Sequence, residues 1–187
     1  MLGKNGGMTG SRHTAVFRPA TATDAAGIAS IYNHYIEHSI ITFEEDPVPA
    51  AEMATRIAEV QASSLPWLVA EENGAAIGYA YATKWRARTA YRFSVEVTVY
   101  VAPDRPRRGI GSGLYRELFP MLQKRGANAV LAGIALPNEA SVALHERFGL
   151  RKVAHLEEVG FKHDRWIDVG YWQCVLRADG VAPTRPT

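Results

Sequence analysis

A single cysteine, Cys174, is present among the 187 residues. One thiol cannot form an intramolecular disulfide and offers no thiolate cluster to a metal, so we expect the fold to depend on packing and the protein to occupy the reducing cytoplasm. Because Cys174 lies among apolar residues, we interpret it as a buried packing residue rather than a nucleophile. No aspartate or histidine spacing resembles a metal site either.

Long apolar runs and an excess of one charge are also missing. No run approaches the roughly 20 apolar residues that span a bilayer, and residues 1–14 lack the hydrophobic segment of a signal peptide. We therefore expect no membrane partner and interpret residues 1–14 and 178–187 as flexible tails. The 21 basic and 19 acidic residues are mixed along the chain and give a formal net charge of +2, which argues against a nucleic-acid partner.

The remaining residues, 15–177, have the composition of one globular domain, with 47% hydrophobic and 21% charged residues in the whole chain. Neither an internal repeat nor a linker interrupts them. Their patterns predict an α/β fold with a mixed sheet. Helices are expected at 24–37, from the prolines at 47 and 49 to 62, at 111–124 and at 138–148; strands are expected at 15–18, 67–71, 76–82, 93–101, 129–135, 151–158 and 166–176, with an extended piece at 40–43.

The strand at 93–101 carries one carboxylate, Glu96, between valines. Alternation places Glu96 on the face opposite Val95 and Val97. A carboxylate on such a strand is costly unless it is hydrogen-bonded or used, and partial burial should raise its pKa toward neutrality. Glu96 is therefore a candidate general base, and a position on a solvated face of the sheet is the alternative.

A glycine-rich turn follows this strand and leads into the helix at 111–124. Glycines at alternate positions (Gly109, Gly111 and Gly113) allow a tight turn and a close approach of the backbone to a ligand. The free amides of the helix start, with Arg107 and Arg108, suit a pyrophosphate. The alternative is that the glycines only turn the chain and the arginines are solvated. A Walker A loop is excluded because the turn has no lysine, and a dinucleotide fingerprint lacks its third glycine in register.

The same turn resembles the Q/RxxGxG/A signature of the GNAT acetyltransferases, with a full match from Arg108 through Gly111 to Gly113. Longer words resemble the phosphinothricin and methionine sulfoximine acetyltransferase subfamily over most of the chain, from Phe17 to Leu176. These words are NHYIEHS (33–39), PWLVAEENG (66–74), TVYVAP (98–103), LPNEASVALHE (136–146) and GFKHDRWIDVGYWQ (160–173).

The resemblance implies a single-domain GNAT fold, with a mixed and mostly antiparallel central sheet flanked by helices, and a cytoplasmic homodimer. It implies that acetyl-CoA donates an acetyl group to the amine of a small amino-acid-like acceptor such as phosphinothricin or methionine sulfoximine. It places Glu96 as the general base. The cofactor residues that it implies, together with those of the turn, are Val99, Tyr100, Val101, Arg107, Arg108, Gly109, Ile110, Gly111, Ser112, Gly113 and Asn138.

His145 stands where many GNAT enzymes have a tyrosine that protonates the departing thiolate. Histidine can donate a proton near pH 7, so His145 is a candidate acid or a group that orients the substrate. A surface histidine on a helix is the alternative. Asn138 is expected to cap the helix, and the resemblance adds a contact with the cofactor.

Cations and aromatic residues gather ahead of Glu96. Arginine forks bind a carboxylate or phosphinate through two hydrogen bonds, so Arg86, Arg88 and Arg92 could hold an acidic amino acid; a charged loop in solvent is the alternative. By resemblance, the acceptor pocket is closed by Phe43 and lined on its far side by Lys162 and His163. The remaining acceptor residues expected are Ala87, Val97 and Thr98.

Two other functions fit the same sequence. The scaffold could acetylate a protein N-terminus or a polyamine, although a polyamine would prefer an acidic pocket and this one is expected to be basic. It could also be a silent module that binds acetyl-CoA, although the presence of Glu96 argues against that.

Overall fold

The computed structural model describes residues 15–176, which form one seven-stranded sheet with two helices on each face. The strand order is β1-β2-β3-β4-β5-β7-β6. Only β4 and β5 run parallel; every other neighbouring pair is antiparallel, which confirms the expected mixed sheet. The strands are β1 (Val16–Pro19), β2 (Trp67–Glu72), β3 (Ala75–Lys84), β4 (Ser94–Val101), β5 (Ala129–Ala135), β6 (Arg151–Lys162) and β7 (Arg165–Val175).

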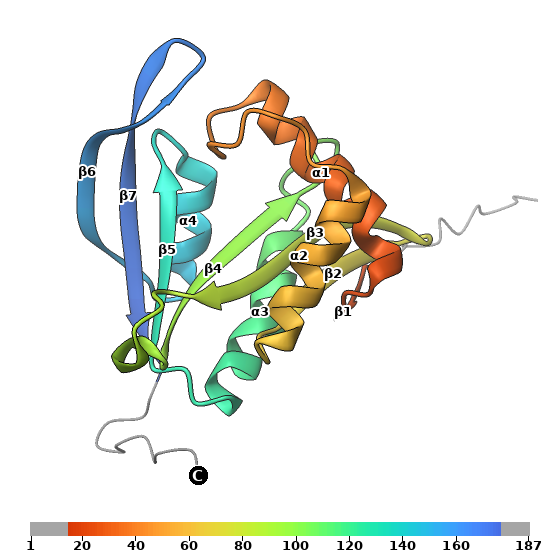
Figure 1. Ribbon diagram of the computed structural model, residues 1–187, viewed down its shortest axis with the longest axis horizontal. Coiled ribbons are helices and arrows are strands. Elements are labelled where there is room, and N and C mark those ends of the chain that lie inside the picture. The colour runs from red at the N-terminus through yellow and green to blue at the C-terminus, as the bar shows by residue number, and fades with distance from the viewer. Residues whose placement is uncertain (1–14, 177–187) are drawn as a thin grey trace, which may run out of the picture.

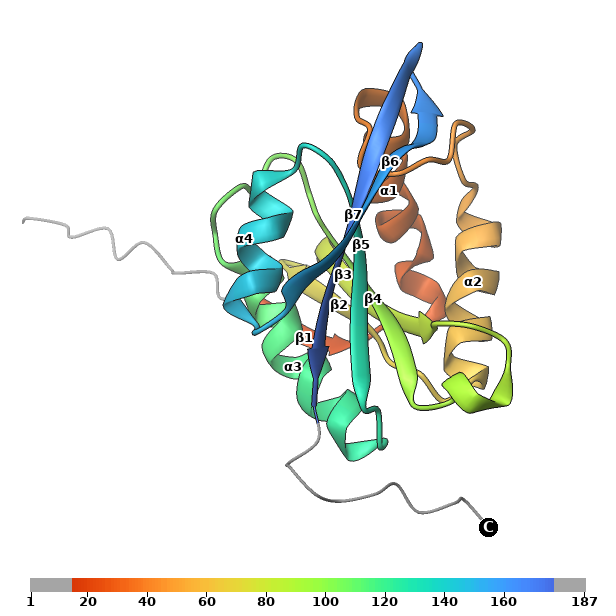
Figure 2. The ribbon, with the colours of Figure 1, turned by 90° about the vertical axis from the view of Figure 1, so that its left-hand side faces the viewer.

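Two hydrophobic cores fix the helices to the sheet. Helices α3 (Ile110–Lys124) and α4 (Glu139–Arg147) cover one face, where Leu114, Leu118 and Val97 are buried together. Helices α1 (Ala25–His38) and α2 (Ala50–Ala62) cover the other face with a separate core that includes Ile28. The sheet therefore forms the middle layer of three, as Figures 1 and 2 show.

The expected order of elements is confirmed, with local differences. A short 3-10 turn, η1 (Ala22–Asp24), precedes α1; Thr21 is the N-cap residue of η1, and Asp24 is the N-cap residue of α1. The carboxylate of Asp24 accepts the Thr21 N–H at 2.7 Å, so the Asp24 side chain bonds the backbone at the start of η1, as in a capping box. Residues 40–43 form a loop, not an extended strand, and β6 continues to Lys162 because it pairs with β7 up to the turn. The expected tails at 1–14 and 178–187 lie outside the described residues.

The single parallel pair is short. Main-chain pairing of β4 with β5 covers only three positions and ends at Glu96 and Leu131. Beyond this point β4 continues to pair with β3 up to Val101, and β5 continues to pair with β7 up to Ala135. The two strands diverge from there toward their C-terminal ends (Figures 1 and 2). Main-chain groups of residues 97–101 and 132–135 thus face each other without a ladder between them.

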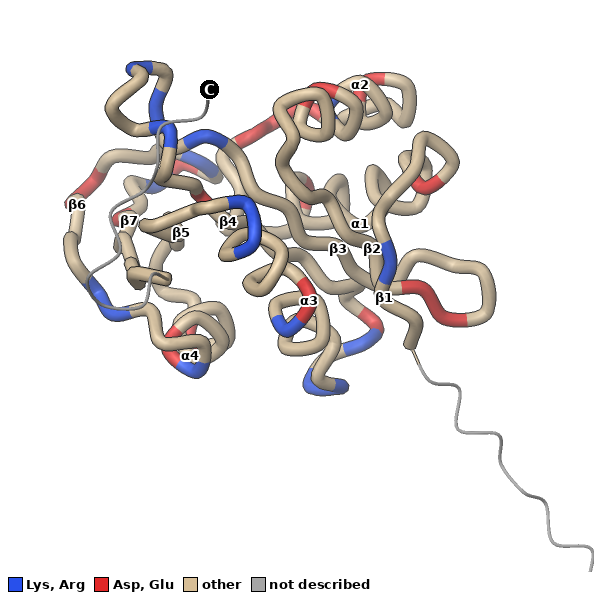
Figure 3. The backbone as a smooth tube through the Cα atoms, turned by 90° about the horizontal axis from the view of Figure 1, so that it is seen from below, with Lys and Arg blue, Asp and Glu red and all other residues tan. Residues whose placement is uncertain are grey.

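Charged residues are distributed over the tube in Figure 3 with both signs interspersed. None of the helices in residues 15–176 has the length and apolar character needed to cross a membrane. Across the same residues, His, Cys, Asp and Glu form no group of three or more that could hold a metal ion.

Helix α3 packs on β1 through a glycine. A Cβ atom placed on Gly113 would lie 2.1 Å from the ring of Phe17, whereas one placed on Gly111 would meet the mobile end of Leu144 at 3.0 Å. Both positions are helical, so the alanine variants gain similar intrinsic helix propensity. The two variants therefore separate the effect of the clash from the effect of propensity.

We predict that Gly113→Ala lowers the free energy of unfolding by about 1–2 kcal/mol, because the overpacked ring must move. Gly111→Ala should be near neutral. Urea denaturation of both variants measures the difference. Equal stability of the two variants would contradict the assigned contact with Phe17.

Candidate active site

Glu96 lies where β4 and β5 separate. Its side chain is half-buried, and the N–H of Gly133 on β5 donates a hydrogen bond to its carboxylate. Burial raises the pKa of Glu96 above its ordinary value, and the Gly133 hydrogen bond opposes this only in part. The expected direction of the pKa shift is confirmed. The pairing register places Glu96 opposite Thr83 on β3 and opposite Leu131 on β5, at the last rung of the parallel ladder.

Tyr171 on β7 joins Glu96 at this point, and the sequence reasoning missed it. A Cβ placed on Gly133 would lie 3.2 Å from Glu96 Oε1 and 3.3 Å from the Tyr171 ring. The absence of a side chain at Gly133 therefore lets the carboxylate and the phenol ring converge over one point of β5. Alternation along β7 places Tyr171 on this face of the sheet, but only the register of β7 against β5 places it beside Gly133. That register depends on tertiary structure, so the sequence alone could not identify Tyr171.

A pocket of about 380 Å³ opens beside these groups. It is bounded by the loop after α1, by β5, and by the β6–β7 hairpin, and its lining is mostly apolar. Gly133 and Tyr171 belong both to this lining and to the surroundings of Glu96. The lining residues are Ile41, Thr42, Phe43, Gly133, Ala135, Leu156, Val159, Val169 and Tyr171.

Phe43 and Lys162 come together at the edge of this pocket. The Phe43 ring lies over Gly160, where an added Cβ would be 2.4 Å from it. The buried Lys162 Nζ donates a hydrogen bond to the Thr42 carbonyl oxygen at 2.9 Å. Burial lowers the pKa of Lys162 below its ordinary value. These two contacts bridge the loop after α1 to the end of β6. His163, at φ 50°, lies beyond them in the hairpin turn.

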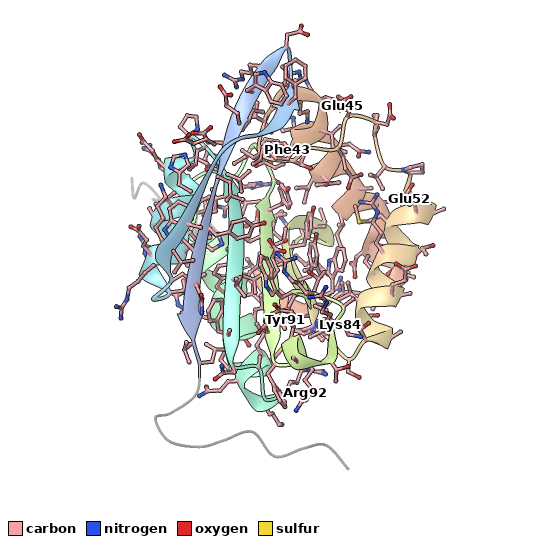
Figure 4. The ribbon with its side chains drawn as sticks, turned by 60° about the vertical axis from the view of Figure 1, so that its left-hand side comes forward. Phe43, Glu45, Glu52, Lys84, Tyr91 and Arg92 are labelled. Atoms are coloured by element: carbon pink, nitrogen blue, oxygen red, sulfur yellow. The ribbon has the colours of Figure 1, made fainter. Side chains whose placement is uncertain are left out.

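The arginines are arranged differently from the expected clamp. Among residues 15–176, none of the arginines lines this pocket, so the expected clamp is not part of its lining and stays a prediction. Arg86 lies over the Trp85 ring at 5.1 Å, and Trp85 meets Tyr171 edge-on at 5.3 Å, which leaves Arg86 at the margin of the site. Arg92 donates to the Thr89 carbonyl, and Figure 4 shows it at the opposite end of the molecule from Phe43.

The other residues expected to bind the acceptor divide between the two faces of β4 and the loop before it. Val97 is buried in the core under α3, so its side chain points away from Glu96. Thr98 lies on the face of Glu96 and hydrogen-bonds the Tyr81 phenol. Ala87 and Arg88 are exposed in the β3–β4 connection. Strand alternation accounts for the error at Val97.

Helix α3 begins at Ile110 behind a left-handed Gly109 with φ 76°, and Arg107 is also left-handed with φ 58°. The first amide of this turn that is bonded within the helix is that of Gly113, which donates to the Gly109 carbonyl at 2.9 Å. The amides of Ile110, Gly111 and Ser112 precede it and have no acceptor within the helix.

The three glycines of the turn have different roles. Gly109 has the positive φ that glycine adopts without strain, and an added Cβ would meet nothing within 4 Å. Gly111 and Gly113 instead admit Leu144 and Phe17, respectively. The interpretation that all three allow a ligand to approach is therefore wrong for Gly113, which the Phe17 ring covers.

Arg108 does not project freely toward the turn. Its guanidinium donates to both carboxylate oxygens of Glu72 at 2.8 and 3.1 Å, and Arg105 contacts the same carboxylate at 2.9 Å. Arg107 is exposed. The sequence could not reveal the role of Glu72, which depends on the packing of the β2–β3 hairpin against this loop.

The candidate backbone contacts on β4 lie along the diverging edge. The Val101 carbonyl accepts a hydrogen bond from the Tyr35 phenol at 2.6 Å, which ties the end of β4 to α1. The Tyr100 ring packs edge-on against Tyr32 at 5.2 Å, and Val99 packs on the α3 side. At the start of α4, Asn138 Oδ1 accepts the Ser141 N–H at 3.1 Å, which confirms the expected cap.

His145 is buried, so its interpretation as a surface residue is wrong. Its Nδ1 lies 2.7 Å from the Ser141 carbonyl oxygen, which can only accept, so Nδ1 carries the proton. Nε2 then accepts a hydrogen bond from the Tyr115 hydroxyl at 2.8 Å. Burial lowers the pKa of His145. Since Tyr115 belongs to the core under α3, His145 and Glu96 lie on opposite faces of the sheet.

Comparison with known proteins defines the class to which this fold and site belong. The family described as "Acetyltransferase (GNAT) domain" matches residues 17–170. A GNAT phosphinothricin acetyltransferase from Sinorhizobium meliloti, solved in complex with AcCoA, superimposes with a TM-score of 0.86 at 39% identity, over 93% of this chain and 94% of that one. The chain therefore belongs to the GNAT acetyltransferases, and acetyl-CoA is its acetyl donor.

Two members of the family are similar to this chain over most of its length. The chain is 42% identical over 179 residues to the phosphinothricin N-acetyltransferase of Streptomyces viridochromogenes, over 96% of each chain. It is 35% identical over 162 residues to an L-methionine sulfoximine/L-methionine sulfone acetyltransferase of Salmonella typhimurium, over 85% of this chain and 93% of the relative. The protein is accordingly an enzyme that transfers an acetyl group to a small amine.

The raised pKa of Glu96 has a consequence for stability. Because the folded protein binds this proton more tightly than the unfolded chain, ionised Glu96 destabilises the fold at pH values above its raised pKa. The cost disappears as the pH falls below the ordinary value of 4.5. A neutral glutamine would avoid the cost and can still accept the Gly133 N–H.

We predict that Glu96→Gln is more stable than the wild type at neutral pH and that this difference shrinks as the pH falls toward 4.5. Urea denaturation at a series of pH values measures it. Glu59→Gln, at an exposed position of α2, serves as the control and should show no such trend. A Glu96→Gln variant that is less stable at neutral pH would refute the proposed destabilisation.

Proposed function

We propose that this chain N-acetylates a small amino-acid-like amine of the phosphinothricin or methionine sulfoximine type, with Glu96 as general base. The observation that carries the proposal is a half-buried carboxylate of raised pKa beside an acceptor-sized pocket, at the point where β4 and β5 separate. The names of the relatives support the choice of acceptor.

The donor supplies an acetyl group activated as a thioester. Glu96 takes a proton from the acceptor ammonium, directly or through one water, so that the nitrogen lone pair can attack the thioester carbon. The C–S bond would then break, and the departing thiolate would take up the second proton that the nitrogen loses. A carboxylate with a pKa raised toward neutrality is a better match to an amine than one at its ordinary value. Tyr171 and the Gly133 backbone bound the space in which the amine is held against this carboxylate.

The residues present fit the donor in two respects. The unladdered edges of β4 and β5, including the backbone of Val99 to Val101, offer main-chain groups to an extended amide-bearing arm. The amides at the start of α3 and the exposed Arg107 suit a diphosphate, because the helix N-terminus favours negative charge. Open space at Gly109 leaves room for that group.

His145 fits an orienting role better than that of an acid. With its proton on Nδ1 and donated to Ser141, the neutral ring has no hydrogen on Nε2 to give away. Protonation of Nε2 would place a charge in a buried site, which the lowered pKa opposes. We propose that the Tyr115–His145 pair shapes the α3 side of the site, opposite Glu96.

The apolar lining favours an acceptor with an uncharged side chain. An anionic phosphinate would enter a pocket whose described lining includes no arginine, and it would lose hydration without a partner. Methionine sulfoximine and methionine sulfone are uncharged at the oxidised sulfur. The same chemistry would also acetylate the amine of phosphinothricin, and such acetylation would give resistance to that herbicide.

We predict thiol release from acetyl-CoA with methionine sulfoximine, methionine sulfone and phosphinothricin. The KM should be lower for the two acceptors with an uncharged side chain, methionine sulfoximine and methionine sulfone, than for phosphinothricin. Glu96→Gln should lower kcat/KM roughly 100- to 10,000-fold, and Glu59→Gln, on the exposed side of α2, should leave it unchanged. Faster turnover of spermidine or of an N-terminal peptide would favour another amine acceptor. Thermal stabilisation by acetyl-CoA without turnover of any amine would identify a binding module.

We propose a homodimer formed through β6. This strand is at the edge of the sheet, and apolar side chains along the β6–β7 hairpin are exposed, among them Val153 at 55% and Trp166 at 61%. The hairpin extends beyond the rest of the sheet in Figure 1. An edge strand with an apolar surface is suited to pairing with a second copy. The single free thiol, Cys174, is compatible with the cytoplasm that we propose as its location.

Light scattering after size exclusion should give twice the monomer mass of 20.5 kDa. The double variant Val153→Lys and Trp166→Glu should shift the protein to the monomer, because it places charges on the proposed interface. Val16→Lys provides a matched control, since Val16 is 57% exposed on β1, the strand at the other edge. A wild-type monomer, or equal dissociation by both variants, would reject the assigned interface.

A further inference from the structure

Glu72 is a buried carboxylate outside the pocket. It ends β2, and only 5% of its side chain is exposed. A buried carboxylate is costly unless cations and hydrogen bonds compensate for lost water. Its neighbour Glu71 pairs with Arg18 at a more exposed position, which shows that this end of the hairpin can carry a carboxylate near the surface. The burial of Glu72 therefore indicates that this carboxylate stabilises the segments that it contacts.

Two of these contacts come from the loop that leads into α3. Arg108 donates both of its terminal nitrogens to the two Glu72 oxygens, and Arg105 contacts one of them at 2.9 Å. Between and beside these arginines lie Arg107 and Gly109, both at positive φ. The left-handed Arg107 is strained for a residue with a side chain, so this loop needs outside restraints to hold its shape.

We infer that Glu72 is a positioning residue for the coenzyme diphosphate, acting through Arg105 and Arg108 on the loop before α3. This inference depends on the proposed role of that loop in holding the diphosphate. Asp104 also contacts Arg105, at 3.1 Å, so two carboxylates face these two guanidinium groups, and the exposed Arg107 leaves the cluster with a net positive charge. Glu72 therefore fixes both arginines while the loop keeps its attraction for an anion. The loop is thereby shaped before the ligand arrives, which lowers the ordering cost of binding.

Removal of the Glu72 charge has two opposing effects on diphosphate binding, and the electrostatic gain is weaker than the loss of a preformed loop. Loss of the Glu72 charge would leave the two arginines more positive, which by itself would attract the diphosphate. Arg108 is exposed, so water and salt screen the attraction of its charge for the diphosphate. Without Glu72, both arginine side chains and the loop that carries them lose conformational freedom when the ligand binds, and this cost is not screened. We therefore expect removal of the Glu72 charge to weaken binding.

The test measures acetyl-CoA binding by calorimetry without any acceptor, and then steady-state kinetics. Glu72→Gln should raise the Kd for acetyl-CoA about tenfold, with kcat at saturating donor and the acceptor KM within twofold of the wild type. Glu71→Gln is the matched control and should leave the Kd unchanged. Thermal unfolding of both variants in the absence of ligand confirms that they are folded.

Acetylpantetheine sharpens the test because it carries the thioester but no diphosphate. Glu72→Gln should lower kcat/KM for acetyl-CoA about tenfold and leave kcat/KM for acetylpantetheine unchanged. In a background with Arg105→Gln and Arg108→Gln, the effect of Glu72→Gln on the Kd should vanish. An unchanged Kd, an equal loss with acetylpantetheine, or an equal effect of Glu71→Gln would overturn the inference.

Gly109→Asp separates this inference from the role of the loop itself. Aspartate tolerates the left-handed conformation and places a negative charge at the start of α3. It should weaken acetyl-CoA and spare acetylpantetheine. If Gly109→Asp has no effect on acetyl-CoA, the proposed diphosphate site is wrong; if it weakens acetyl-CoA while Glu72→Gln does not, only the role of Glu72 is wrong.

Discussion

The early end of the parallel ladder between β4 and β5 determines the rest of this structure. A parallel pair buried between two helical layers would normally extend the full length of its strands, since unpaired main-chain groups inside a protein are costly. Here it stops at Glu96, and the outer partners β3 and β7 keep the two strands rigid while they separate. The carboxylate of Glu96 lies at the point where the two strands begin to separate.

Each buried ionisable group near this separation is stabilised in a different way, and the difference indicates its role. Glu72 has guanidinium partners, and Lys162 donates to a backbone carbonyl. Glu96 has one backbone N–H and no cation among the causes of its pKa shift, so its ionisation is left costly. A structural carboxylate is compensated as Glu72 is; an uncompensated one at the edge of a pocket is suited to taking a proton.

The sequence was sufficient to predict the features that depend on neighbouring residues along the chain. Alternation along β4 located Glu96, and the glycine turn located the start of α3 within one residue. It failed where long-range packing decides. The Phe17 ring explains Gly113, and nothing near Gly113 in the chain points to β1. The Arg86 region was expected to line a basic pocket because charge is visible in a sequence, whereas the apolar lining is brought together from four separate segments.

The proposed acceptor pocket is assembled from segments that lie far apart in the sequence. The loop after α1 provides Phe43, and the end of β6 provides Gly160 beneath it, so neither segment closes the pocket alone. The hydrogen bond from Lys162 to Thr42 fixes the two segments relative to each other. Because β6 carries both this bridge and the exposed apolar edge, a second copy pairing along β6 would bear on the pocket wall. Dimer formation and choice of acceptor would then be coupled through one strand.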